Sequence, residues 1–329
     1  MQFYQNLLHS YSEKSNPNSP DFETTIENIP FLCRSESGSK TAQHFVASCR
    51  PEQIDQIIRV VSPHLGELMS DHYGSYMCRT LFDRCSFEQR LFLFNTIRDE
   101  MVSISKIGKG TRSMQHIIRV VRFPEEEAVF QQAFKGRIFE LSMINNGSHA
   151  IQVFSEWQNR EFFIREILGH VRELASDKLG VMVIKKIIDE PRVFNELLDN
   201  TIALMQDKYG NCAFQHMLDY WGEECSLPII NCIKGHALGL CIQKYSSNVM
   251  DKCVKEKRMR RAIINELKSV ERMQVLLDNP YGCYFLRTAA LEIELDQKEG
   301  LKRAVLAAIP LTEQKNYKPR WNEILSYLR

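Results

Sequence analysis

The sequence has no uninterrupted run of the roughly 18 apolar residues that a membrane-spanning helix requires. Its first residues also lack the basic stretch followed by an apolar one that marks a secretory signal peptide. The metal-binding motif H-E-x-x-H, the nucleophile motif G-x-S-x-G and the phosphate-binding P-loop are absent, and acidic residues form no recurring close pair. We therefore expect neither a membrane protein nor an enzyme, and no cofactor.

The ten cysteines form no C-x-x-C pair, which zinc sites and redox motifs usually contain. Several lie in apolar helical stretches, where a reduced cysteine behaves as a small hydrophobic residue. We expect packing thiols, no bound metal and a reducing, cytoplasmic compartment.

A basic excess is missing as well, because 42 Lys and Arg residues face 41 Asp and Glu residues, for a net charge of +1. Proteins that bind nucleic acid mainly through phosphates usually carry a large positive charge. If RNA is the ligand, much of the affinity must therefore come from the bases.

What the sequence does contain is a repeat. The segments GSKTAQ, GSYMCR, GTRSMQ, GSHAIQ, GVMVIK, GNCAFQ, SSNVMD and GCYFLR align, and we call the residue after the leading Gly or Ser the anchor. Successive anchors are 36, 36, 37, 33, 30, 36 and 36 residues apart. Apolar residues at helical spacing follow each anchor, and strand signals are almost absent. A helical unit of this length cannot bury its apolar face alone, so the units must stack into an all-α solenoid.

Each unit also carries local turn signals. A glycine precedes most anchors, and it allows the backbone to approach a neighbour or a ligand closely. A residue suited to turns and helix N-caps often lies four positions before the anchor, at Ser35, Asp71, Asp177, Asp207, Gln243 and Asn279. We place the repeats in residues 31–290, an N-terminal cap in 1–30 and a C-terminal cap in 291–329. The turn-rich stretch Ser12–Asp21 is expected to be partly flexible.

Three positions of each anchor helix could meet an RNA base. The first (the anchor) and the fifth lie one turn apart and point the same way, and the second lies about 100° around the helix. Polar groups at first and fifth could hold the edge of a base while the second covers its face. The first and fifth residues are Ser39/Gln43, Ser75/Arg79, Thr111/Gln115, Ser148/Gln152, Val181/Lys185, Asn211/Gln215, Ser247/Asp251 and Cys283/Arg287. The second positions expected to stack are Lys40, Tyr76, Arg112, His149, Asn248 and Tyr284, whereas Met182 and Cys212 are expected to pack or to be neutral.

These segments resemble the RNA-reading helices of the Pumilio/PUF family. The resemblance covers roughly residues 30–290 and is most evident in DKYGNCAFQHML, QKYSSNVMDKCV, GTRSMQHII and NNGSHAIQVF. It implies a right-handed, crescent-shaped α-solenoid of eight three-helix Pumilio-type repeats, with single-stranded RNA on its concave face. The protein is expected to be a monomer. It also implies control of mRNA translation or stability through 3′ UTR elements, with deadenylase or translational repressor proteins as partners.

The resemblance further implies a code in which repeat one faces the 3′ base. Asn with Gln suggests uracil, Ser or Cys with Gln adenine, Ser with Glu guanine, and Ser or Cys with Arg cytosine. With Asp251 taken as a shorter glutamate and Thr111 as a serine, the expected site is 5′-CGUNAACA-3′. Val181 and Lys185 offer no paired edge, so repeat five could tolerate any base. Arg79 and Arg287 could instead hold phosphates.

Two alternatives stay open. A HEAT- or armadillo-type solenoid that binds protein would have a similar stack of helices, but its first and fifth positions should vary freely. A PUF-related factor for ribosomal RNA processing would be expected to carry extra repeats and basic segments. His44, His116 and His216 each follow a fifth-position Gln and are expected to be structural or close to phosphate.

Overall fold

The computed structural model describes residues 20–329, and this part of the chain contains helices and no strand. The expected all-α fold is therefore confirmed. The stretch Ser12–Asp21, expected to be flexible, lies outside the described residues except for its last two, which begin α2 (Pro20–Leu32). Within residues 20–329, no helix is both long and apolar enough to cross a membrane.

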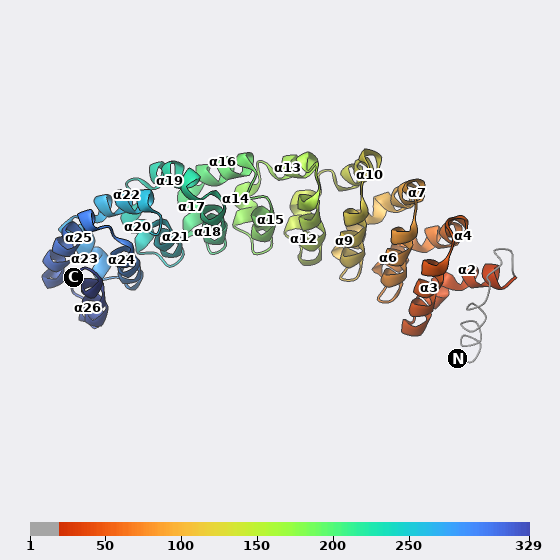
Figure 1. Ribbon diagram of the computed structural model, residues 1–329, viewed down its shortest axis with the longest axis horizontal. Helices are drawn as coiled ribbons and strands as arrows, with labels where there is room; N and C mark the ends of the chain where they lie inside the picture. The colour runs from red at the N-terminus through yellow and green to blue at the C-terminus, as the bar shows by residue number, and fades with distance from the viewer. Residues whose placement is uncertain (1–19) are drawn as a thin grey trace. The chain divides into compact units, whose positions relative to one another are not determined.

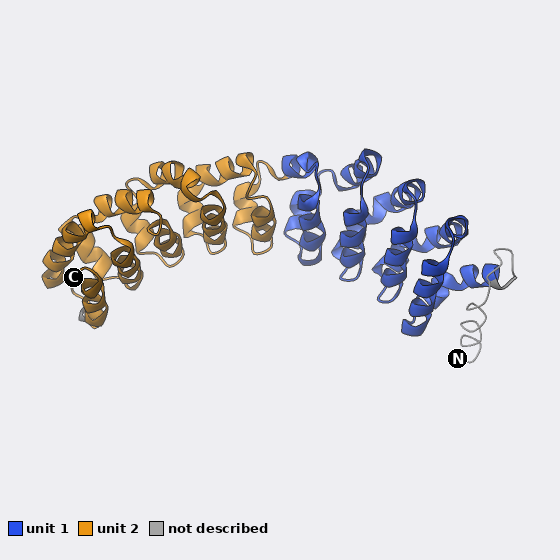
Figure 2. Ribbon diagram, viewed as in Figure 1, with its two compact units in different colours: residues 1–166 blue, residues 167–329 orange. Residues whose placement is uncertain are grey.

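The chain divides into two compact units, residues 1–166 and 167–329 (Figure 2). The division falls at the end of α13 (Glu161–Ile167). It lies close to the two shortened intervals between anchors, which are 33 and 30 residues long.

Unit 1 repeats the order of a short helix, an anchor helix and a following helix. Its helices after α2 are α3 (Glu36–Ser48), α4 (Pro51–Val61), α5 (Leu65–Ser70), α6 (Gly74–Arg84), α7 (Phe87–Ile97), α8 (Met101–Lys106), α9 (Gly110–Val120), α10 (Pro124–Phe134), α11 (Ile138–Ser142), α12 (Asn145–Ile151) and α13. The anchor helices α3, α6, α9 and α12 pack side by side in one row, and α4, α7 and α10 pack in a second row (Figure 1). The expected stacking of helical repeats is present in this unit.

Unit 2 has the same order. Its helices are α14 (Val171–Ala175), α15 (Gly180–Lys186), α16 (Pro191–Asp199), α17 (Thr201–Gln206), α18 (Gly210–Trp221), α19 (Ser226–Ile233), α20 (Ala237–Cys241), α21 (Ser246–Cys253), α22 (Lys257–Leu267), α23 (Val270–Leu277), α24 (Pro280–Glu292), α25 (Leu295–Ala308) and α26 (Lys318–Tyr327). The anchor helices α15, α18, α21 and α24 pack in sequence, and α26 packs on α24 at the end of the row. Both α25 and α26 begin within the expected C-terminal cap.

In five of the eight repeats, the turn before the anchor helix is closed by two bonds to the residue that the sequence indicated, whereas Ser35 accepts one, from the Gly38 N–H at 3.2 Å. In α6 the Asp71 Oδ1 accepts hydrogen bonds from the backbone N–H groups of Tyr73 and Gly74, each at 2.8 Å. Such a side chain closes a turn and satisfies donors that the helix start leaves free. The same pair of bonds is made by Asp177, Asp207, Gln243 and Asn279.

The glycine before the anchor lies so close to the backbone of the preceding helix that a Cβ atom would not fit there. A Cβ atom on Gly210 would lie 2.6 Å from the carbonyl oxygen of Leu204, at the end of the short helix α17. Repeat seven has Ser246 at this place, and its Oγ donates to the carbonyl of Leu240 at 2.7 Å. The contact is therefore made with the preceding short helix of the same repeat.

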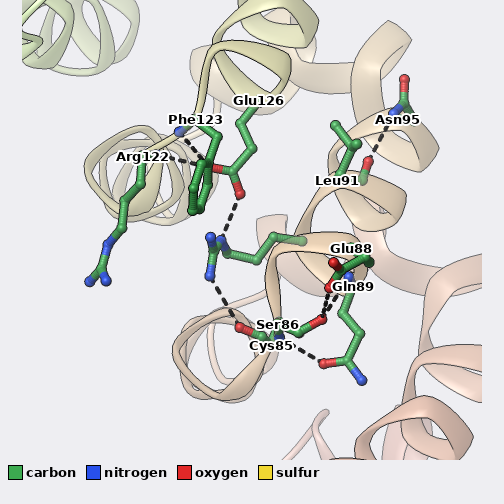
Figure 3. Close-up of polar contacts among 10 residues, drawn as sticks. Cys85, Ser86, Glu88, Gln89, Leu91, Asn95, Arg122, Phe123 and Glu126 are labelled. Carbon is green, nitrogen blue, oxygen red and sulfur yellow. Dashed lines mark hydrogen bonds and ion pairs between the residues drawn. The ribbon is translucent and has the colours of Figure 1, made fainter.

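A buried ion pair joins repeats two and three within unit 1 (Figure 3). Arg90 on α7 donates from Nε to Glu126 on α10 at 2.8 Å, and the Glu126 side chain is fully buried. The second carboxylate oxygen of Glu126 accepts from the backbone N–H groups of Arg122 and Phe123, at 2.8 and 3.2 Å. A buried carboxylate is tolerated because it is paired and hydrogen-bonded in this way.

Candidate nucleic-acid interface

The first positions are the most enclosed of the three. All eight lie in the first turn of a helix and are buried, with between 0% and 7% of their surface exposed. Two of their hydroxyls bridge to the next repeat: Ser39 Oγ donates to the carbonyl of Tyr73, and Thr111 Oγ1 to that of Asn146, each at 2.7 Å. Ser39 and Thr111 therefore tie neighbouring repeats together, a role that the spacing alone did not reveal. Each hydroxyl oxygen still has lone pairs with which to accept a hydrogen bond.

The second positions lie at the surface. Lys40, Tyr76, Arg112, His149, Met182, Asn248 and Tyr284 are exposed, and Cys212 is half-buried. Met182 is 45% exposed, so it does not pack in the interior. Of the two roles expected for it, packing and no effect on RNA binding, only the second remains. The rings of Tyr76 and Tyr284 are 42% and 57% exposed and are flat surfaces of the kind on which bases stack. An arginine lies over each ring, Arg79 over Tyr76 and Arg320 over Tyr284.

The fifth positions are half-buried at the sides of the anchors. Gln215 Nε2 donates to Asn211 Oδ1 at 3.0 Å, and Gln43 Nε2 donates to Ser39 Oγ at 3.2 Å. First and fifth side chains thus meet, as their spacing predicted. Gln152 is the first residue of a 3₁₀ helix that follows α12, and its backbone keeps a helical conformation, so it stays one turn beyond Ser148.

Repeat five departs from this pattern. Val181 is buried and apolar, Lys185 is half-buried, and α15 has seven residues where α6 and α9 have eleven. The pair offers no two polar groups to one base edge, so tolerance of any base at repeat five stays a prediction.

The two arginines at fifth positions have different surroundings. The Arg79 guanidinium lies 4.6 Å from the centre of the Tyr76 ring, and its Nε donates to the Ser75 carbonyl at 3.3 Å. Arg287 donates from Nε to Glu323 on α26 at 2.6 Å. The sequence pattern treated the two positions as alike.

A row of lysines in unit 2 was missed by the sequence analysis. Lys178, Lys208 and Lys244 all lie three residues before an anchor and are exposed. The ammonium groups of Lys208 and Lys244 lie 5.1 and 5.4 Å from the ring centres of Tyr209 and Tyr245. Their shared register was the available signal, since the same position in unit 1 holds Glu36, His72, Gly108 and Asn145.

The model of the Pumilio-family RNA-binding repeat matches residues 28–62, 64–98, 200–234 and 236–268. These segments contain the anchors Ser39, Ser75, Asn211 and Ser247. The chain is similar to the Pumilio/PUF family in these four repeats. A family of RNA-binding repeats fits the regular first, second and fifth positions better than a HEAT- or armadillo-type solenoid does.

Family members from several organisms are similar over most of the chain. Pumilio homolog 12 of Arabidopsis thaliana is 27% identical over 292 residues, which are 84% of this chain and 48% of that protein. A Pumilio domain-containing protein of Schizosaccharomyces pombe is 27% identical over 295 residues, 86% of this chain and 43% of that protein. The chain thus spans about half the length of the curated family members it matches.

Solved structures of the family have the same fold. The Puf4 RNA-binding domain, bound to a 3′ UTR recognition sequence of HO endonuclease RNA, is 25% identical with a TM-score of 0.80. The match covers 90% of this chain and 97% of that domain. Yeast Puf5p, solved with SMX2 RNA, is 21% identical and matches the fold with a TM-score of 0.74 over 92% of this chain.

Proposed function

We propose that this protein binds single-stranded RNA with sequence specificity, reading about one base per repeat, and has no catalytic role. The observation that carries the proposal is the shared pattern of exposure: a buried first position, a half-buried fifth and, except at Cys212, an exposed second. A base stacked on the second position would offer its edge to the fifth, in the arrangement by which single-stranded RNA is recognised. The Puf4 and Puf5p structures, both solved with RNA, support the same role.

Repeat six illustrates the chemistry. Asn211 Nδ2 donates to the carbonyls of Asp207 and Lys208, each at 2.9 Å, so its Oδ1 is held facing Gln215. Gln215 donates one N–H to this oxygen, which leaves its Oε1 and its second N–H to bind a base. Those two groups match the N3–H donor and a carbonyl acceptor of uracil. Asn211 therefore acts by orienting Gln215.

The other pairs follow the same logic. The amide of Gln152 matches the donor and acceptor of adenine, and the Asp251 carboxylate can accept the two N–H groups of guanine. The Arg79 guanidinium, which only donates, suits the two acceptors of cytosine. Read from repeat eight to repeat one within residues 31–290, the proposed site is 5′-CGUNAACA-3′. We assign the exposed Lys178, Lys208 and Lys244 to phosphates.

In the cell we propose binding to elements in mRNA 3′ untranslated regions, with control of translation or stability through deadenylase or repressor proteins. The ten cysteines, all within the described residues, are free, which agrees with a reducing, cytoplasmic location. With a net charge of +1, affinity should fall only modestly with salt compared with strongly basic RNA-binding proteins.

The test is in vitro selection from a random RNA pool with the purified chain. We expect an eight-base motif with G-U near its 5′ end and cytosine opposite repeat two. A G-U core with uracil opposite repeat two would support sequence-specific RNA binding but reject the proposal that Arg79 recognises cytosine. Failure to enrich any motif would reject RNA recognition and favour a protein-binding solenoid.

A further inference from the structure

Repeats two and eight carry nearly the same reading residues. Repeat two has Ser75, Tyr76 and Arg79, and repeat eight has Cys283, Tyr284 and Arg287. A code that depends on these residues alone assigns both repeats the same base. The side chains that surround them differ.

Arg79 is paired with no carboxylate in the part of the chain that the structure describes. Its guanidinium lies over Tyr76 of its own helix. The fifth position of the following repeat, 36 residues further on, is the neutral Gln115. Apart from Nε, which donates to the Ser75 carbonyl, the N–H groups of Arg79 are therefore available to an incoming base or phosphate.

Arg287 is already engaged. Its Nε donates to Glu323 Oε1 at 2.6 Å, and Tyr327 donates from its hydroxyl to the same oxygen at 3.2 Å. The Arg287 guanidinium also lies 5.9 Å from the Tyr327 ring centre. The pairing raises the pKa of Arg287 and lowers that of Glu323, so both groups stay charged. A charge-assisted bond of this length is among the stronger side-chain hydrogen bonds.

The stacking residue of repeat eight is covered as well. The guanidinium of Arg320 lies 4.5 Å from the centre of the Tyr284 ring, and it donates to the Tyr284 hydroxyl at 3.3 Å. Both side chains that would read RNA in repeat eight are thus contacted by α26.

Helix α26 has the register of a further anchor helix. Arg320 and Glu323 follow Tyr284 and Arg287 by 36 residues, as Arg112 and Gln115 follow Tyr76 and Arg79. Trp321 Nε1 donates to the carbonyl of Leu277, 44 residues earlier, and Ser113 Oγ donates to that of Met69, also 44 residues earlier. The contact between α26 and repeat eight is therefore a continuation of the repeat stack, with a glutamate at its fifth position.

We propose that Glu323, assisted by Arg320, sets the base selectivity of repeat eight by holding the side chains that would otherwise read RNA there. A base at this repeat must compete with an intramolecular carboxylate for Arg287, so the protein should discriminate poorly at the 5′ base. Removing the carboxylate should convert repeat eight into a cytosine reader. The inference rests on the proposed function and revises the first base of the proposed site. Glu323 is a positioning residue, because it acts through Arg287.

The experiment compares the intact chain with its Glu323→Gln variant. Dissociation constants are measured for 5′-CGUAAACA-3′ and for the three RNAs in which the first base is changed. In the parent we expect less than about a twofold preference for cytosine at this base. In Glu323→Gln we expect about a tenfold preference, the size of one well-made base-edge contact. The preference is a ratio within one protein, so a lower folded fraction does not alter it.

Two further variants isolate the cause. Glu299→Gln removes an exposed acidic charge from α25 and should leave the first-base preference as in the parent. In the double variant Glu323→Gln/Arg287→Gln the gained preference for cytosine should disappear, because the effect runs through Arg287. The same result from Glu299→Gln as from Glu323→Gln would overturn the proposal and assign the effect to net charge.

The remaining outcomes separate this inference from the proposed function. If the parent prefers uracil opposite repeat six and Glu323→Gln leaves the first-base preference unchanged, the inference alone is wrong. If Glu323→Gln binds all four RNAs more tightly by the same factor, the inference is also wrong, and Arg287 contacts phosphate rather than the base. If the parent binds none of these RNAs, and selection also enriches no motif, the proposed function fails and the inference with it.

Discussion

Gln215 and Asn211 hold each other across one turn of α18, through a hydrogen bond of 3.0 Å from Gln215 Nε2 to Asn211 Oδ1. Asn211 is itself held by two backbone carbonyls. The reading pair of repeat six is therefore arranged before any RNA arrives, which reduces the ordering that binding would require.

Replacing Gln215 by alanine should weaken binding to 5′-CGUAAACA-3′ by about 1–3 kcal/mol, because the edge contact to uracil is lost. The penalty for changing this uracil to cytosine should shrink in the same variant. Fluorescence anisotropy with labelled RNA measures both. The matched control is Gln132→Ala, which removes an exposed glutamine from α10, outside the anchor helices, and should bind as the parent does. Equal affinity of Gln215→Ala and the parent would refute the assignment of repeat six.

Replacing Arg79 by glutamine should change the preferred seventh base from cytosine to adenine. The variant leaves Ser75 with a glutamine, the pair that the family resemblance associates with adenine. A preference of about tenfold is expected in each protein. Arg59→Gln removes an exposed positive charge from α4 and serves as the control. Uniform weakening with every seventh base would instead assign Arg79 to phosphate.

Bound RNA should protect one particular thiol. Cys212 and Cys232 are half-buried, whereas the other eight cysteines are buried. Burial raises the pKa of Cys33 to about 12 and that of Cys253 to about 12, so few reactive thiolates form there at pH 8. Iodoacetamide at pH 8, followed by mass spectrometry, should therefore label Cys212 and Cys232 first. RNA should slow labelling of Cys212, at a second position, and leave Cys232 unaffected; equal protection of both would contradict the proposed interface.

Replacing Gly210 by alanine should lower the free energy of unfolding by about 1–3 kcal/mol. The added methyl group would lie 2.6 Å from the Leu204 carbonyl oxygen, so the turn or the short helix must shift. Gly300→Ala is the control, because open space surrounds that position inside α25. It should be neutral, or stabilise by up to about 1 kcal/mol through helix propensity. Urea unfolding followed by circular dichroism distinguishes the two, and similar curves would argue against the close approach at Gly210.

Replacing Glu126 by alanine should destabilise unit 1 by about 3–5 kcal/mol, because the Arg90 side chain, only 12% exposed, loses its carboxylate and keeps the Cys85 carbonyl. The comparison is Glu67→Ala, which breaks an ion pair of 2.6 Å with Arg34. Both members of that pair are more than half exposed, so a loss of at most about 1 kcal/mol is expected. Native-state hydrogen exchange of α7 and α10 would locate the effect, and equal losses in the two variants would rule out a special role for the buried pair.

The register of the repeats and the turns before the anchors could be predicted from the sequence because both depend on local contacts. Asp71, for example, closes its turn with N–H groups two and three residues away. The pairing of first and fifth positions was equally accessible, since helix geometry alone places them one turn apart. Met182 shows the limit of such arguments: an apolar side chain was expected to pack or to be neutral, and it lies 45% exposed.

Contacts between repeats could not be anticipated in this way. The bond from Ser39 to the Tyr73 carbonyl spans 34 residues, and that from Arg287 to Glu323 spans 36. Each depends on how one repeat stacks on the next, and no local propensity records that. Residue types and spacing therefore indicated which side chains could read a base. Among the described residues, the packing of neighbouring helices established which of them, such as Arg79, meet no carboxylate and which, such as Arg287, are already paired with one.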